Sequence, residues 1–194
     1  AVDYKELEVP KDGYYGEFIP NPAVREALRA WFESYKGKLT WHNATYDLAL
    51  LWSHDFEVTG PIFDTMVAAW LLEPGRGNYG LKDLVWNRFG VEMTPISALI
   101  GKGRDQISMA EVDPQRVAPY AGADADMTLR LARAQEPELR ERALWDLFTQ
   151  IEMPLTPILT RMEMAGILLD ADYLLGLSTE FHQRLQALEL EIYD

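Results

Sequence analysis

Apolar residues between Val24 and Tyr35 recur at helical spacing and fall on one face, which is the pattern of an amphipathic helix. Asn21-Pro22 precedes them, and Asn is a favoured N-cap while Pro fits the first helical position. Gly37 follows them. We therefore predict a helix that begins at Pro22 and ends at Gly37.

The next pattern is β-compatible, over residues 38–41, and runs straight into helical spacing over residues 43–52. A strand that leads at once into a helix indicates an α/β fold. After the turn at Gly60-Pro61 comes a short apolar run, and Asp64-Thr65 then predicts the start of a further helix that ends before Pro74.

Helical patterns account for most of the remaining chain. We expect a helix over residues 81–89, an irregular segment over residues 90–112, a long helix from Asp113-Pro114 that Pro137 ends or bends, a helix from 151 to Gly166, and a last helix from Asp172 onward.

Composition narrows the classes of protein and of site. The 194 residues are 48% hydrophobic, enough for a buried core in one domain, or in one domain and part of another. With no Cys and three His, disulfides and Cys/His zinc sites are excluded, so any metal must be held by oxygen.

Charge and hydropathy exclude further partners. The formal net charge is −13, which argues against a general duplex-DNA binder, because such proteins need clustered Lys and Arg. The first residues lack a signal-peptide pattern, and no stretch approaches the ~20 apolar residues of a membrane span. We expect a cytoplasmic protein without a membrane partner.

Two short clusters carry candidate chemistry. Asn43, Tyr46 and Asp47 follow the first predicted strand, and Tyr120 and Asp124 lie on the long helix. The four-residue spacing places the outer members of each cluster on one helix face. Each cluster alone is an ordinary helix end with a cap or a solvated acid, but the two together form a more specific combination.

The segments His42–Asp47 and Tyr120–Asp126 resemble the second and third motifs of the 3′-5′ proofreading exonuclease domain of bacterial-type family A DNA polymerases. Residues 63–66 and 100–103 resemble that family in order and rough spacing, and residues 151–155 and 161–166 resemble the junction leading into the polymerase thumb. The resemblance covers nearly the whole chain.

The resemblance implies a ribonuclease-H-like α/β fold, a mixed sheet flanked by helices, with four acidic metal ligands and a tyrosine in the third motif. The expected cofactors are two Mg²⁺ or Mn²⁺ ions, since two ions about 3.5–4 Å apart can assist both the attacking water and the departing oxygen. Ions so close together need several carboxylates, and oxygen ligation suits both metals.

Residue by residue, the resemblance makes Asp47 and Asp124 metal ligands and makes Tyr120 the residue that orients the attacking water. Asn43 and Tyr46 match positions that support the site and contact the terminal nucleotide. The expected substrate is the single-stranded 3′ end of a DNA primer.

The first motif of the family, a D-x-E on the opening strand, has no match upstream of Asp47. Residues 13–20 resemble a later strand of the sheet, Asp3 and Glu6 have the wrong spacing, and the D-x-E at Asp55–Glu57 follows the second motif. Either the native chain carries the missing acids further upstream or the parent protein has lost them. We expect this chain by itself to be nearly inactive and to bind at most one metal ion weakly.

We therefore expect an exonuclease domain over residues 1–150, lacking its first strand, and the start of the polymerase thumb over residues 151–194. The expected function is proofreading hydrolysis within a monomeric DNA polymerase, with the rest of that polymerase as the main partner. The first alternative is a catalytically silent scaffold that braces the polymerase. The second is a free-standing ribonuclease-D-like nuclease, which the thumb-like residues 151–194 disfavour.

Overall fold

The computed structural model describes residues 22–58 and 60–193 of the chain. The chain divides into two compact units, Ala1–Met164 and Ala165–Asp194. The early segments singled out above, Asp3–Glu6, residues 13–20 and the cap Asn21, lie outside the described residues. No helix within the described residues is long and apolar enough to span a membrane.

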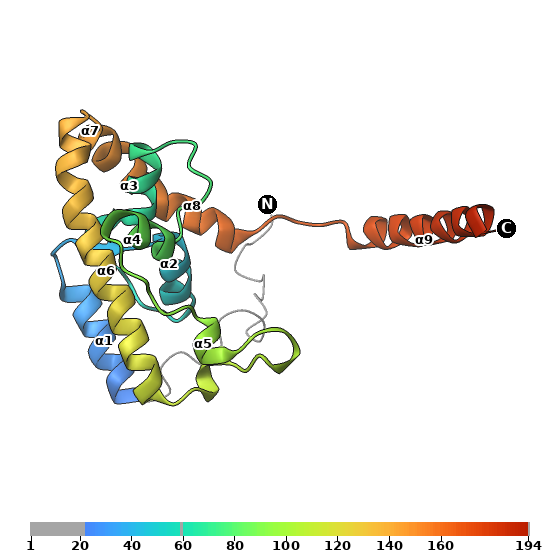
Figure 1. Ribbon diagram of the computed structural model, residues 1–194, viewed down its shortest axis with the longest axis horizontal. Helices are drawn as coiled ribbons and strands as arrows, with labels where there is room; N and C mark the ends of the chain where they lie inside the picture. Colours follow the sequence, from blue (N-terminus) through green and yellow to red (C-terminus); the bar gives the residue numbers. More distant parts are fainter. Residues whose placement is uncertain (1–21, 59, 194) are drawn as a thin grey trace. The chain divides into compact units, whose positions relative to one another are not determined.

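A small parallel sheet forms the centre of the first unit (Figure 1). Strand β1 (Leu39–Trp41) pairs with β2 (Ile62–Asp64), with Leu39 opposite Ile62 and Trp41 opposite Asp64. Helix α2 (Ala44–Ser53) belongs to the crossover that joins them, as parallel strands require. The predicted strand-then-helix pattern is confirmed, and the described residues contribute two parallel strands to the sheet.

Most helix positions predicted from the sequence are confirmed. Helix α1 spans Pro22–Ser34, α3 spans Thr65–Leu72 with Asp64 as its N-cap, and α4 spans Leu81–Phe89. Residues 90–112 are irregular apart from short turns, α5 (Ser97–Ile100), η1 (Gly103–Asp105) and η2 (Met109–Glu111).

Helix α6 (Pro114–Glu141) is the long central helix, and it contains both Pro119 and Pro137. Termination at Pro137 is therefore wrong. The reason is burial: Gln135 and Leu139, on either side of this proline, are 2% and 0% exposed, so tertiary packing holds the last turn in helical form despite the lost hydrogen bond.

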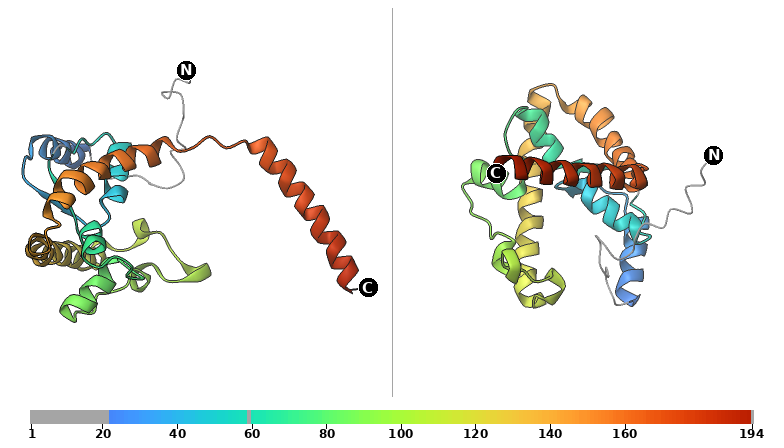
Figure 2. Two further views of the ribbon diagram at one scale, coloured as in Figure 1. Left: turned by 90° about the horizontal axis from the view of Figure 1, so that it is seen from above. Right: turned by 90° about the vertical axis from the view of Figure 1, so that its right-hand side faces the viewer.

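Two hydrophobic clusters attach α6 to the rest of the first unit, and Figures 1 and 2 show α3 and α4 beside it. One cluster joins Phe63 of β2 to Leu72 of α3 and Leu139 of α6. The other joins Leu84 and Val85 of α4 to Leu131 of α6. These contacts hold α3, α4 and β2 against α6.

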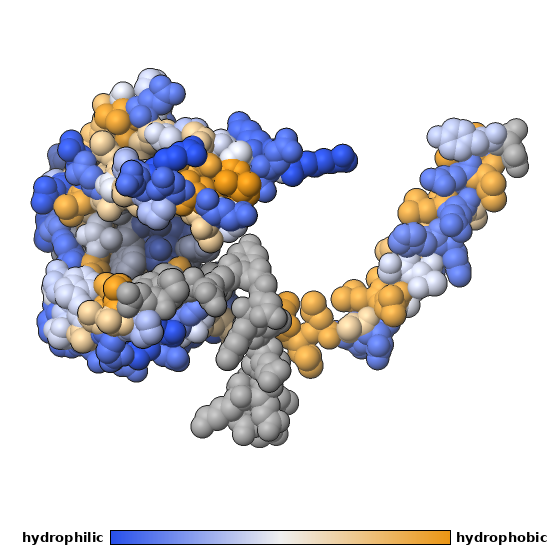
Figure 3. Space-filling view, turned by 90° about the horizontal axis from the view of Figure 1, so that it is seen from below, coloured by the Kyte–Doolittle hydropathy of each residue, from blue (hydrophilic) through white to orange (hydrophobic). Residues whose placement is uncertain are grey.

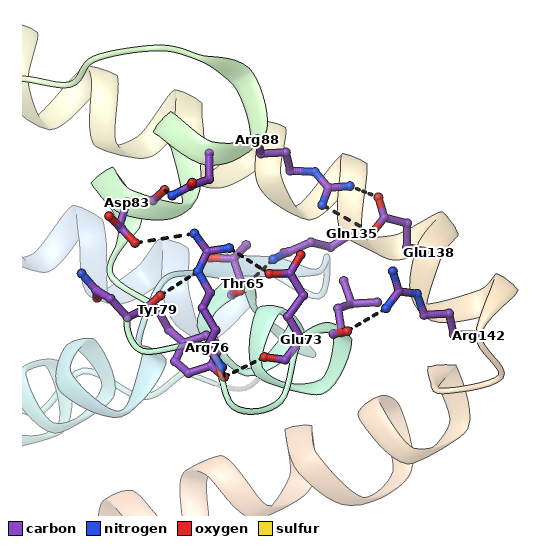
Figure 4. A network of polar contacts seen from close by, with 12 residues as sticks. Thr65, Glu73, Arg76, Tyr79, Asp83, Arg88, Gln135, Glu138 and Arg142 are labelled. Atoms are coloured by element: carbon purple, nitrogen blue, oxygen red, sulfur yellow. Dashed lines mark hydrogen bonds and ion pairs between the residues drawn. The ribbon is translucent and has the colours of Figure 1, made fainter.

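A polar network fixes the segment between α3 and α4 (Figure 4). Arg76 pairs with Glu73 at 2.9 Å and with Asp83 at 3.5 Å. The Tyr79 hydroxyl donates to the Glu73 carbonyl at 2.8 Å and accepts from the Arg76 backbone N–H at 3.0 Å. The start of α4 is thereby held in one position relative to α3.

The segment after α6 packs on the same core. It comprises α7 (Trp145–Leu147), the single π-helical turn η3 (Phe148–Glu152) and α8 (Met153–Ala165). Phe148 and Met153 are 1% and 6% exposed and belong to the cluster around Phe63. Helix α8 ends at Ala165, and Gly166, the predicted stop, follows with a φ of +65°.

The second unit consists mainly of α9 (Ala171–Tyr193), which begins one residue before the predicted Asp172. It has no buried residue. Its surface in Figure 3 mixes apolar and polar side chains, and Phe181 and Leu185 are 53% and 58% exposed.

Candidate active site

A cavity of about 810 Å³ opens at the carboxyl end of β1, between α2, α4 and α6. Ligands bind at this edge of parallel sheets because loops from successive strands converge there. The lining residues that carry chemistry are His42, Asp47, Lys82, Asp83, Tyr120 and Asp124. Packing therefore brings Asp47 and Asp124, which are 77 positions apart, to one cavity.

Asp47 occupies the first turn of α2 and is partly buried. Burial, and after it the negative charge of Asp64, raise the pKa of its carboxyl from 3.8 to about 6. An acid in such an environment is poorly solvated as an anion and gains from a bound cation.

Asp64 is the most buried acid near the cavity, at 2% exposed. Its Oδ1 accepts backbone N–H bonds from Asn43 at 3.1 Å and Met66 at 2.8 Å, and its Oδ2 accepts one from Ala44 at 2.6 Å. One carboxylate thus binds the N-terminal turns of both α2 and α3, where the helix dipoles favour negative charge.

His42 contributes a neutral ring to the cavity wall. The Thr65 hydroxyl donates to the Trp41 carbonyl at 3.0 Å, so its oxygen accepts from Nδ1–H of His42, 2.9 Å away. Burial lowers the pKa of His42 although Asp64 and Asp124 oppose that shift. Its buried Nε2 has no hydrogen-bond partner within the described residues.

Tyr120 and Asp124 lie one turn apart on α6, and Lys82 of α4 contacts both. Lys82 Nζ is 3.3 Å from the Tyr120 hydroxyl and 3.6 Å from Asp124 Oδ1. Asp124 Oδ1 is buried and accepts no hydrogen bond within the described part of the chain. Asp124 is therefore paired by charge but incompletely satisfied.

Asn43 and Tyr46 lie beside this arrangement and are not among the described residues that line the cavity. Asn43 is the N-cap of α2, but it adopts a left-handed conformation with φ +66°, and its side chain makes no capping bond. Tyr46 is 49% exposed. Their expected contact with a terminal nucleotide stays a prediction.

Two members of the site were not predicted as site residues. Asp64 is predicted as a cap of α3, which is confirmed, but its bonds to α2 come from a segment about 20 positions away. Lys82 is an ordinary polar residue in the first turn of α4. Only the approach of α4 to α6 gives it a role.

Comparison with known proteins identifies relatives of this chain. A family model described as 3'-5' exonuclease matches residues 9–140. DNA polymerase I of Chloroflexus aurantiacus is 41% identical over 178 residues, which are 90% of this chain and 19% of that protein. DNA polymerase I of Treponema pallidum is 36% identical over 173 residues, covering 88% of this chain and 17% of that protein.

The chain spans about a fifth of the length of these curated relatives. Among solved structures, the POL domain of Pol1 from M. smegmatis, in complex with DNA primer-template and dNTP, matches with a TM-score of 0.64 and 24% identity, over 86% of this chain and 26% of that one. At this identity the match shows the fold alone. The expected family resemblance is confirmed: the chain belongs to the 3'-5' exonuclease family and resembles the exonuclease domain of bacterial DNA polymerase I.

Proposed function

We propose that this chain is the exonuclease domain of a DNA polymerase I and that, in the intact polymerase, it hydrolyses the 3′ end of the primer strand during proofreading. The observation that carries this proposal is the meeting of Asp47, Tyr120 and Asp124 in one cavity. The sequence resemblance assigns these same three residues to one active site. The packing of the helices brings all three to the cavity.

The donor set of the cavity fits one divalent cation. Asp47 and Asp124 offer carboxylate oxygens, and a buried oxygen of Asp124 accepts no hydrogen bond among the described residues. Mg²⁺ is commonly bound by one or two carboxylates together with waters and substrate phosphate. We propose Mg²⁺ or Mn²⁺ at these two acids.

A second ion would need further acids. No set of three or more His, Asp or Glu side chains that could hold a metal ion occurs within residues 22–58 and 60–193. The family resemblance assigns the two additional acids to a first motif, so the proposal places them upstream of Asp47 in the native polymerase.

The residues of this chain have separate tasks in the proposed reaction. Asp47 and Asp124 would hold the metal ion, and the ion would neutralise charge developing on the scissile phosphate. The Tyr120 hydroxyl already accepts from Lys82, which leaves its own proton available to orient water or a phosphate oxygen.

The remaining expectations belong to the same proposal. The two parallel strands with their crossover are compatible with a ribonuclease-H-like sheet. We assign residues 1–150 to the exonuclease domain and residues 151–194 to the start of the polymerase thumb. The partners are a single-stranded primer end and the rest of a monomeric, cytoplasmic polymerase.

Asp47→Ala and Asp124→Ala in the intact polymerase test the function. We expect each variant to lose 3′-5′ digestion of single-stranded DNA by at least about a hundredfold while primer extension persists, because only the exonuclease reaction uses these acids. Asp126→Ala is the matched control, since Asp126 lies on the same helix and pairs with Arg130 at 2.9 Å. Digestion that survives Asp124→Ala would contradict the assignment.

A catalytically silent scaffold is the second candidate. Two observations favour it, namely the lack of a third described metal ligand and the ammonium of Lys82 beside Asp124. It predicts that the intact wild-type polymerase does not digest single-stranded DNA at all, whereas the proofreading proposal predicts digestion with added Mg²⁺.

A further inference from the structure

Lys82 is held in place by three groups, one in the segment after α4 and two on α6. Its Nζ donates to the Thr94 carbonyl at 2.5 Å and to the Tyr120 hydroxyl at 3.3 Å, and it lies 3.6 Å from Asp124 Oδ1. The ammonium also lies 4.3 Å from the centroid of the Tyr120 ring, a cation–π distance. These contacts fix a flexible side chain at a single point of the site.

The charges around the cavity give this ammonium a specific role. Among the described residues that line the cavity, Lys82 is the sole Lys or Arg, against Asp47, Asp83 and Asp124. Asp83 has its own partner in Arg76. Among these lining residues, Lys82 is therefore the positive charge that pairs with Asp124.

Within the described residues, Lys82 is the one cationic side chain that pairs with the carboxylate of Asp124. Its buried Oδ1 accepts no hydrogen bond within the described residues, and its ion pair with Lys82 leaves room at the oxygen because 3.6 Å is longer than a hydrogen bond. A divalent cation such as Mg²⁺ would bind that oxygen at about 2.0–2.1 Å. The two cations would then share one oxygen and repel each other.

We propose that Lys82 is the resident counter-cation of Asp124 and Tyr120 and that a divalent cation binds Asp124 in competition with it. The inference rests on the proposed function, because it takes Asp124 as a metal ligand. Lys82 keeps the acid and the phenol in place when no metal is bound. It also lowers the affinity of the site for metal, so that metal binding requires the ammonium to withdraw.

Calorimetric titration of the 194-residue chain with Mn²⁺ tests this competition. Lys82→Met and Lys82→Gln both remove the charge, and the Gln side chain keeps a donor for the Thr94 carbonyl. We expect each variant to bind Mn²⁺ roughly tenfold more tightly than wild type, since one unit of positive charge near a divalent ion is removed. Lys82→Arg keeps the charge and should bind like wild type.

Lys38→Met is the matched control. Lys38 pairs with Glu136 at 2.7 Å on the surface and does not line the cavity, so this variant changes the net charge of the chain equally. We expect its Mn²⁺ affinity to equal that of wild type, which separates a local effect from a general one.

Asp124→Asn distinguishes a failure of the proposed competition from a failure of the metal assignment. Loss of Mn²⁺ binding in Asp124→Asn, together with tighter binding in either uncharged Lys82 variant, supports the competition. Unchanged or weaker binding in Lys82→Met and Lys82→Gln, with loss in Asp124→Asn, overturns the competition and leaves the metal assignment intact. Unchanged binding in Asp124→Asn overturns the metal assignment itself.

Discussion

Asp47→Asn should make the metal-free chain more stable at neutral pH. Wild-type Asp47 is partly buried beside Asp64, and its pKa is raised from 3.8 to about 6 by burial first and by that neighbouring charge second. Asn has nearly the same shape without the charge, so the variant removes the unfavourable ionised group and retains most of the packing.

The sign follows from proton linkage. A native carboxyl with a raised pKa holds its proton more tightly than the unfolded chain does, so it favours the native state at low pH. That contribution is complete below the unfolded pKa near 3.8 and is lost as the pH rises to about 6. Above that window wild type carries the full cost of the buried charge, and Asp47→Asn does not.

The magnitude follows from the same two values. The difference between 3.8 and about 6 corresponds to about 3 kcal/mol when each pKa unit is worth 1.36 kcal/mol. Asp47 is partly exposed, so solvent screening reduces the expected gain to about 1–2 kcal/mol.

Urea unfolding followed by tryptophan fluorescence measures this gain. We expect Asp47→Asn to exceed wild type by about 1–2 kcal/mol near pH 7.5 and by almost nothing near pH 4. Asp126→Asn, the same substitution at a half-exposed site of α6, should change stability by less than about 0.5 kcal/mol at either pH. Equal stability of Asp47→Asn and wild type at pH 7.5, or a gain independent of pH, would refute the reasoning.

The remaining predictions concern the scaffold of the site. Asp64→Asn should destabilise the chain by about 2–4 kcal/mol in urea unfolding. Both carboxylate oxygens of Asp64 accept backbone N–H groups, and the amide NH₂ that replaces one oxygen would face such an N–H group instead of accepting from it. A loss below about 0.5 kcal/mol would show that these bonds do not hold α2 to α3. Phe148→Ala should lower the free energy of unfolding by about 3–5 kcal/mol, because the ring is 1% exposed and its centroid lies 4.8 Å from that of Phe63. Ile151→Ala is the control, because Ile151 is 56% exposed, and it should lower the free energy of unfolding by less than about 1 kcal/mol. A cost for Phe148→Ala as small as that of Ile151→Ala would mean that η3 does not belong to the core.

The tryptophans show where a pattern of apolar positions is insufficient. Trp31 and Trp70 lie at helical spacing with other apolar residues, yet they are 44% and 48% exposed. Helical spacing indicates which residues share a face, but whether another element covers that face depends on the rest of the fold.

The sequence by itself determined the local features of this protein. Caps, prolines and glycines predict both ends of α3 and the end of α8, because these signals act within one or two helical turns. The same local spacing identified Asp47, Tyr120 and Asp124 as candidates, and the family resemblance that they carry is confirmed.

The tertiary structure alone decided how these residues act on one another. The effect of Asp64 on the pKa of Asp47, the bonds from Asp64 to the start of α2 and the ammonium of Lys82 beside Asp124 all join segments about 20 to 40 positions apart. Burial and electrostatic energy depend on distances in space, which the packing of α2, α3, α4 and α6 sets and no short stretch of sequence contains.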